Sequence, residues 1–147
     1  MFRKILALGL LAGASQGLSA NDRVELSRAV FLETASSAPG GKLRSIEPAQ
    51  NLRRGDKVIL LVEWRAARGS DGFSVSSPVP GHLSYARSSD DSVEVSVDGG
   101  RNWGALDRAR IGNRKATPED VTHLRWRVSM REARAGSGRI TYSAIVR

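Results

Sequence analysis

The sequence predicts an all-β protein that contains a single antiparallel β-sandwich. Two observations carry this prediction. Several short segments have an apolar residue at every second position, which is the period of a strand with one buried face. Turn-forming residues separate these segments at short intervals, and no stretch has the apolar spacing of a long helix. The 127 residues that follow position 20 suit one domain with one core.

The predicted strands differ in how many of their faces are apolar. Residues 57–65 (KVILLVEWR) are apolar on both faces over part of their length, which indicates a central strand. Residues 93–97, 123–130 and 140–146 alternate more strictly, and residues 24–34 do so less regularly. The side chains expected in the core are Val58, Leu60, Val62, Trp64, Val93, Val95, Val97, Leu124, Trp126, Val128, Ile140, Tyr142 and Val146.

Glycine, proline and small polar residues mark the turns between these strands. Pro78 and Pro80 cannot donate a hydrogen bond to a neighbouring strand, so their segment is expected at a sheet edge or a strand end. Thr117 is placed to cap one helical turn over residues 118–120. The predicted turn segments are 36–42, 53–56, 68–72, 77–81, 98–100 and 135–138.

The first twenty residues have the features of a secretory signal peptide. Arg3 and Lys4 precede an apolar run at 5–14, which is too short to cross a bilayer that needs about 20 apolar residues. Small and polar residues follow as far as Ala20, where we expect cleavage. We therefore expect export to the periplasm or secretion, with no transmembrane span in the mature chain. The predicted organisation is a signal peptide at 1–20, an N-terminal strand and flexible segment at 21–42, and the sandwich domain at 43–147.

The composition excludes several classes of chemistry. The chain has no cysteine, which removes thiol catalysis and cysteine-ligated metals, and its two histidines are too few for a histidine-rich metal site. We expect no cofactor and no metal. Of the 23 basic residues, 21 remain after position 20, against 15 acidic ones, which leaves a net charge of +6. A domain of this length buries enough surface to fold without disulfides.

Five motifs follow one another in the second part of the chain. They are GDKVILLVEW at 55–64, SPVPG at 77–81, VSVDGG at 95–100, VTHLRW at 121–126 and GSGRITY at 136–142. In this order and spacing, residues 43–147 resemble the immunoglobulin-like conserved repeat domain of unknown function found in bacterial envelope and surface proteins. One difference is the segment at 65–69 (RAARG), where that family usually has an asparagine-glycine turn. The resemblance implies an immunoglobulin-like sandwich that acts as a structural or adhesive module, and it brings no catalytic residues.

One segment also resembles part of an enzyme. SVDGGRNWG at 96–104 fits the Asp box that is repeated in sialidases and other β-propellers, with Ser96, Asp98, Gly100 and Trp103 in register. A single copy does not form a propeller, because each blade is itself a four-stranded sheet. We therefore interpret the segment as a hairpin turn. In this interpretation Asp98 accepts hydrogen bonds from nearby amides, the two glycines have positive φ, and Trp103 packs on the sheet.

The remaining candidates for catalysis or metal binding are isolated residues. His123 is a candidate because histidine is a common general acid or base, but no serine nucleophile motif accompanies it. We expect it at the surface or at a sheet edge, bonded to Glu119 or Asp120. Asp90 and Asp91 are adjacent, so on a strand they point to opposite faces and supply too few ligands for calcium. We expect neither an enzyme activity nor a metal site.

The arginine-rich surface is the one candidate binding face. Arg125 and Arg127 project from one face of a predicted strand, and the strand that carries Arg139 and Arg147 is expected to pair with it. Arginine suits phosphate, sulfate and carboxylate groups because its planar fork donates two parallel hydrogen bonds. The candidates for contact with an anionic partner are Arg125, Arg127, Arg139, Arg114 and Lys115. A solvated basic surface that serves solubility is the simpler interpretation of the same residues.

Three functions stay open at this point. A structural or protein-interaction module of the cell envelope is the first expectation, with an envelope protein as partner. A binder of anionic glycans or lipid headgroups is the alternative, and specific nucleic-acid binding is not expected for an exported protein. A hydrolase would require a deep cleft near His123 or Asp98. The oligomeric state does not follow from the sequence.

Overall fold

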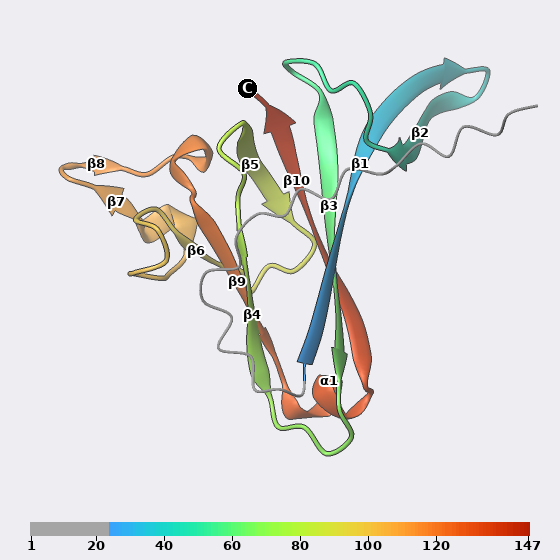
Figure 1. The fold of residues 1–147 in the computed structure, drawn as a ribbon. Coiled ribbons are helices and arrows are strands. Elements are labelled where there is room, and N and C mark those ends of the chain that lie inside the picture. The colour runs from blue at the N-terminus through green and yellow to red at the C-terminus, as the bar shows by residue number, and fades with distance from the viewer. Residues whose placement is uncertain (1–23) are drawn as a thin grey trace, which may run out of the picture.

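The computed structural model describes residues 24–147, so the predicted signal peptide lies outside the described residues. The all-β prediction is confirmed: the described chain consists mainly of antiparallel strands with one short α-helix (Figure 1). The strands are β1 (Val24–Ala38), β2 (Gly41–Pro48), β3 (Lys57–Ala66), β4 (Phe73–Pro78), β5 (Leu83–Ser88), β6 (Glu94–Ser96), β7 (Arg110–Ile111), β8 (Arg114–Lys115), β9 (His123–Val128) and β10 (Ser137–Val146). The helical elements are the 3-10 turns η1 (Leu106–Arg108) and η2 (Pro118–Asp120) and the helix α1 (Met130–Arg134).

Two sheets form the body of the molecule. The larger sheet has five strands in the order β2-β1-β3-β10-β5, and the smaller has three in the order β4-β9-β6. β3 pairs with β1 on one side and with β10 on the other, which confirms its predicted central position. β4 is an edge strand that ends at Pro78, as the prolines predicted. β7 and β8 form a separate two-stranded hairpin that projects from one side of the molecule (Figure 1).

The hydrophobic core lies between the two sheets. Alternate residues of β3 and β9 are buried, and the ring of Trp126 on β9 lies 6.0 Å from that of Tyr142 on β10, across the interface. The predicted core is confirmed except for Val93 and Val97, which are only half-buried. β6 has only three residues, so these two valines lie just outside its ends, and Val93 still packs against the core.

The first two strands extend the larger sheet at its N-terminal edge. β1 pairs with β3 from Val24 to Glu33, and it then continues past the start of β3 with β2 as its paired strand. The predicted domain boundary at residue 43 lies inside β2. All eight residues of β2 are exposed, and the side chains of Leu43 and Ile46 are 61% and 62% exposed. Because neither face of β2 is covered, its sequence does not alternate between apolar and polar residues.

The chain crosses between the two sheets through α1. β9 ends at Val128, earlier than predicted, because Ser129 begins the helix. The Ser129 hydroxyl accepts a hydrogen bond from the backbone N–H of Glu132, and the Glu132 carboxylate accepts one from the backbone N–H of Ser129. Met130 is therefore exposed on α1, whereas strand alternation predicted that it faces inward. A similar capping box at Thr117 begins η2, as predicted.

Candidate functional site

The segment that resembles an Asp box forms a closed turn beside the smaller sheet. Val95 and Gly104 exchange two backbone hydrogen bonds, of 2.8 and 3.1 Å, across its base. Gly99 and Gly100 have φ angles of 80° and 89°, a region that other residues rarely adopt. These are the backbone angles that the turn interpretation requires.

The carboxylate of Asp98 organises this turn. Its Oδ1 accepts hydrogen bonds from the backbone N–H groups of Arg101 and Asn102 at 3.1 and 2.9 Å, and from the hydroxyl of Ser96 at 2.8 Å. The side-chain amide of Asn102 donates to Oδ2 at 2.6 Å. The bonds from Asn102, followed by that from Ser96, hold the pKa of Asp98 well below its usual range, because they favour the ionised form. Asp98 is therefore a structural anion whose acceptor positions are occupied by its own turn.

Trp103 packs from this turn onto the outer face of β9. The guanidinium carbon of Arg125 lies 4.4 Å from the centroid of the indole ring, in a cation–π contact. The ring of His123 meets the indole edge-on, with centroids 6.4 Å apart. The turn and the solvent-facing side of β9 thus form one cluster, in which the indole of Trp103 contacts both the guanidinium group of Arg125 and the imidazole of His123.

Arg125 and Arg127 share one carboxylate. The Nε atom of Arg125 lies 3.0 Å from Oε2 of Glu94, and that of Arg127 lies 3.5 Å from the same oxygen. The hydrogen bond from Arg125 and the two positive charges lower the pKa of Glu94. The Arg125 side chain is 27% exposed and that of Arg127 is 75% exposed, so Arg125 is largely committed to the surface of β9. The two arginines therefore present one uncompensated charge rather than two.

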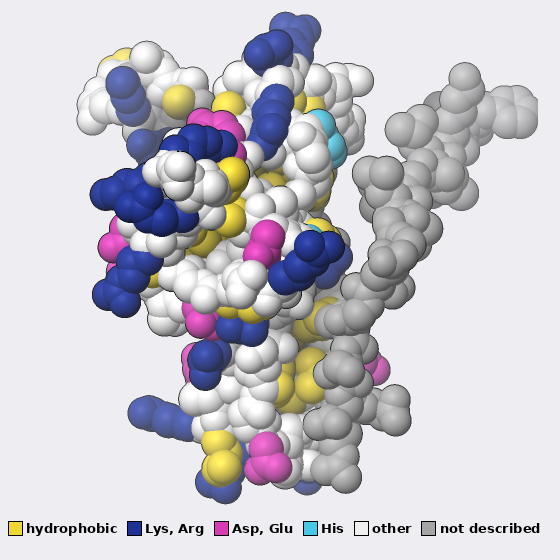
Figure 2. Space-filling view, turned by 90° about the vertical axis from the view of Figure 1, so that its left-hand side faces the viewer, with side chains coloured by type: hydrophobic (Ala, Val, Ile, Leu, Met, Phe, Trp, Pro, Cys, Tyr) yellow, Lys and Arg dark blue, Asp and Glu magenta, His cyan; other side chains and the backbone are white. Residues whose placement is uncertain are grey.

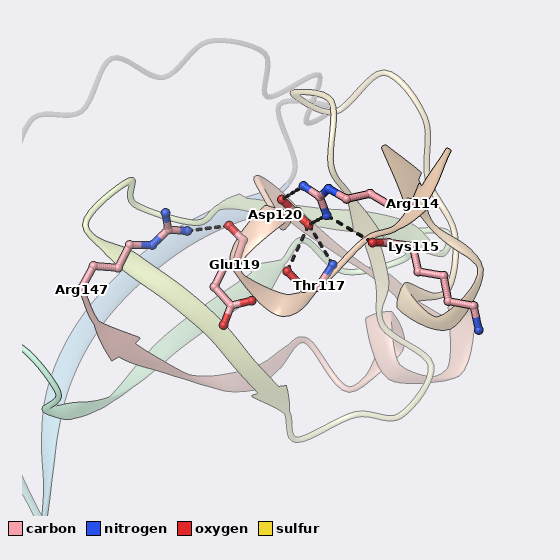
Figure 3. Close-up of polar contacts among 6 residues, drawn as sticks. All are labelled: Arg114, Lys115, Thr117, Glu119, Asp120 and Arg147. Carbon is pink, nitrogen blue, oxygen red and sulfur yellow. Dashed lines mark hydrogen bonds and ion pairs between the residues drawn. The ribbon is translucent and has the colours of Figure 1, made fainter. Parts of the chain in front are cut away.

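The predicted pairing of the strands that carry Arg125 and Arg139 is wrong. β10 pairs with β3 and β5, whereas β9 pairs with β4 and β6. The predicted basic face is consequently divided between two sheets. Arg127 and Arg139 nevertheless line one cleft of about 210 Å³, together with Asp90 and Glu132, whose charges oppose theirs. Arg147 donates a hydrogen bond to a backbone oxygen of η2 (Figure 3).

Arg114 joins the β7–β8 hairpin to η2. Its guanidinium group donates to both carboxylate oxygens of Asp120, at 2.6 and 2.8 Å (Figure 3). The backbone N–H of Thr117 donates to the same carboxylate at 2.8 Å. Arg114, followed by Thr117, holds the pKa of Asp120 well below its usual range. Arg114 therefore anchors the hairpin to η2. The side chain of Lys115 points away from this group and is exposed to solvent.

The β7–β8 hairpin has a feature that the sequence reading missed, the exposed side chain of Ile111. All six residues from 110 to 115 are exposed, and Arg110 donates to the backbone oxygen of Asn113 at 3.2 Å, across the turn. We call residues 108–115 the basic hairpin. Figure 2 faces this side of the molecule and shows Lys and Arg side chains gathered on it. The signal in the sequence was RIGNRK, a glycine-asparagine turn between basic residues.

His123 and Asp98 line neither of two clefts in the described part of the chain. The Nδ1 atom of His123 is 3.1 Å from the hydroxyl of Thr122, and not bonded to Glu119 or Asp120 as predicted. The cleft of about 210 Å³ is lined by neither His123 nor Asp98, and the same is true of a cleft of about 380 Å³ between β5 and β6. Within residues 24–147, the structure groups no three potential metal ligands.

In the part of the chain that the structure describes, no helix has the length and apolar character needed to cross a membrane.

Comparisons with known proteins identify no relative of this chain. The sequence matches no family model, and no similar curated protein and no similar solved structure was found.

Proposed function

We propose that the chain is an exported, non-catalytic β-sandwich of immunoglobulin-like type with a protein-interaction role in the cell envelope. The observation that carries the proposal is the edge strand β2, which is exposed along its whole length. The predicted signal peptide supports export. The order of motifs from residue 43 onward supports the immunoglobulin-like assignment.

β2 offers a backbone edge to which a partner strand can be added. The N–H group of Ala49 donates to the backbone oxygen of Val30 at 3.1 Å, so Ala49 directs its backbone groups toward β1. In an antiparallel pair every second residue of a strand does the same, and the residues between them direct their backbone groups away from the paired strand. The backbone groups of Lys42, Arg44 and Ile46 therefore point away from β1. An extended segment of another protein binds such an edge through main-chain hydrogen bonds. The two cations disfavour pairing with a second copy and favour a neutral or acidic strand.

The charged side chains that resembled a binding site serve the fold. Asp98 is surrounded by its own turn, Arg114 is held by Asp120, and Glu94 binds Arg125 and Arg127. A surface for anionic glycans or lipids centred on Arg125 therefore has less support than the β2 edge. The absence of an enzyme activity is part of the proposal, since His123 contacts a tryptophan and a hydroxyl rather than an activated nucleophile.

Affinity capture from native envelope extract tests the proposal. The tagged protein is compared at low and high salt with Ile46→Pro, which removes an outward N–H and leaves the β1–β2 ladder intact, and with Ile46→Ala, which removes the side chain alone. We expect one discrete protein that survives high salt, is lost with Ile46→Pro and is retained with Ile46→Ala. Capture that is lost at high salt, or equal capture by both variants, contradicts strand addition at β2.

A further inference from the structure

We propose that the basic hairpin docks onto the surface of an anionic lipid bilayer, with Ile111 inserted among the headgroups and the free cations of the hairpin against the lipid phosphates. This interaction goes beyond the function proposed above, because it uses a different surface from β2. It rests on three observations: the hairpin projects, its charge is mostly uncompensated, and it carries one exposed apolar side chain.

The hairpin is held at its base and exposed beyond it. Ala116 donates a backbone hydrogen bond to Ala109 at 2.9 Å, and Arg114 is bonded to both oxygens of Asp120. Beyond this base, Arg110 pairs with Lys115 and Ile111 pairs with Arg114, with every one of these residues exposed. The fold thus presents a short, braced ribbon whose end is accessible to a large flat surface (Figure 1).

The charge of the basic hairpin is compensated only in part. Asp107 is the single acidic residue between positions 101 and 116. Among the ion pairs formed by residues 24–147, Arg114 is the one hairpin cation with a carboxylate partner. Three cations thus remain available to an anionic surface, namely Arg108, Arg110 and Lys115. Each basic side chain close to an anionic membrane contributes about a fivefold increase in binding.

The side chain of Ile111 favours a lipid surface over other anions. Residue 111 is 37% exposed and pairs with Arg114, while Arg110 and Lys115 lie on the other face of the ribbon. A glycan or a nucleic-acid backbone binds the cations but provides no apolar phase for the isoleucine. A bilayer supplies both, because an apolar side chain enters the boundary between headgroups and acyl chains while flanking cations contact phosphates.

The absence of cysteine allows a local test in the full chain. Ile111→Cys, labelled with the environment-sensitive dye NBD, is mixed with vesicles of phosphatidylcholine alone or enriched in phosphatidylglycerol. The control is Leu43→Cys with the same label, since Leu43 is 61% exposed and also flanked by cations. Because the dye reports its own surroundings, membrane binding by another part of the chain does not produce the signal at 111.

We expect a blue shift and brighter emission at position 111, only with anionic vesicles, reversed by high salt and absent at position 43. Lys115→Gln in the labelled background lowers vesicle affinity about fivefold, whereas Lys42→Gln does not. An unchanged emission at 111 overturns the proposal. Equal signals at the two labelled positions, or equal effects of the two glutamine variants, also overturn it, because they indicate non-specific adsorption. Ile46→Pro is expected to leave the signal unchanged, so this test and the β2 test fail independently.

Discussion

Gly138 lies against the buried indole of Trp64, and we expect Gly138→Ala to destabilise the protein through this one contact. A Cβ at position 138 would lie 2.6 Å from Cε2 of Trp64 and closer still to Cζ2. Non-bonded carbon atoms are favourably separated by about 3.5–4.0 Å, so the indole has to move by about 1 Å. Trp64 is 5% exposed and meets the ring of Phe73 edge-on at 5.3 Å, which limits that movement.

The size of the effect follows from two opposing contributions. Overpacking of a core lowers the free energy of unfolding by about 1–3 kcal/mol. Replacement of glycine by alanine also stabilises by about 0.4–1 kcal/mol, because it restricts the unfolded chain. The φ angle of Gly138 is outside the left-handed region, so backbone strain adds nothing. We expect a net loss of about 1–2 kcal/mol, which corresponds to a fall in Tm of roughly 3–8 °C for a chain of this size.

Urea unfolding monitored by tryptophan fluorescence measures this loss, and a double-mutant cycle assigns it to the contact. In the Trp64→Leu background the clash is absent, so Gly138→Ala is expected to leave stability unchanged or to raise it by up to about 1 kcal/mol. Gly81→Ala is the matched control, since a Cβ there meets no atom within 4 Å. The reasoning is refuted if Gly138→Ala is as stable as Gly81→Ala, or if its effect is the same in both backgrounds.

Three further substitutions test the polar interior and the turn. Asp98→Asn is expected to lower Tm near pH 7 and to have less effect at about pH 3, which thermal melts at both pH values measure. The reason is that the depressed pKa of the Asp98 carboxylate stabilises the folded state above the unfolded pKa, and this contribution is lost as pH falls toward the folded pKa. Ser88→Ala removes the hydroxyl that accepts a 3.0 Å hydrogen bond from the buried indole N–H of Trp126, and urea titrations should show a free energy of unfolding lower by about 1–3 kcal/mol. The control Ser92→Ala, at an exposed position, should change the free energy of unfolding by less than about 0.5 kcal/mol. Tyr142→Phe removes a buried hydroxyl that has no hydrogen-bond partner of good geometry among the described residues, so the urea midpoint should be unchanged or higher, and a clear decrease would reveal a bond to that hydroxyl.

Local patterns in the sequence predicted local structure. Alternation along β9 placed Leu124, Trp126 and Val128 inside, because the faces of a strand alternate whatever its neighbours are. The Asp98 turn was predictable for a similar reason, since the bonds to its carboxylate come from within four residues. Alternation did not identify β2, because a strand with two solvent-exposed faces carries no apolar pattern.

Contacts between distant segments were not predictable. Glu94 and Arg125 are 31 positions apart, and with 15 acidic residues in the chain nothing singled out this pair. The pairing of β9 with β10 was expected because consecutive strands are often neighbours. The capping box at Ser129 instead starts a helix that carries the chain into the other sheet. The candidate surface changed accordingly, from a face centred on Arg125 to the edge of β2 and the basic hairpin.

The arrangement of β1, β3 and β10 determines how the protein responds to mechanical force. β1 and β10 are both antiparallel to β3 and therefore parallel to each other, so Val24 and Val146 lie at opposite ends of the larger sheet (Figure 1). Tension applied between these two residues pulls β1 and β10 in opposite directions along β3. Within each interface, the ten pairs between β1 and β3 and the nine between β3 and β10, the residue pairs are then loaded together in shear rather than one after another as in peeling. A protein tethered near Val24 and pulled near Val146 is therefore loaded in shear along the strands of its larger sheet.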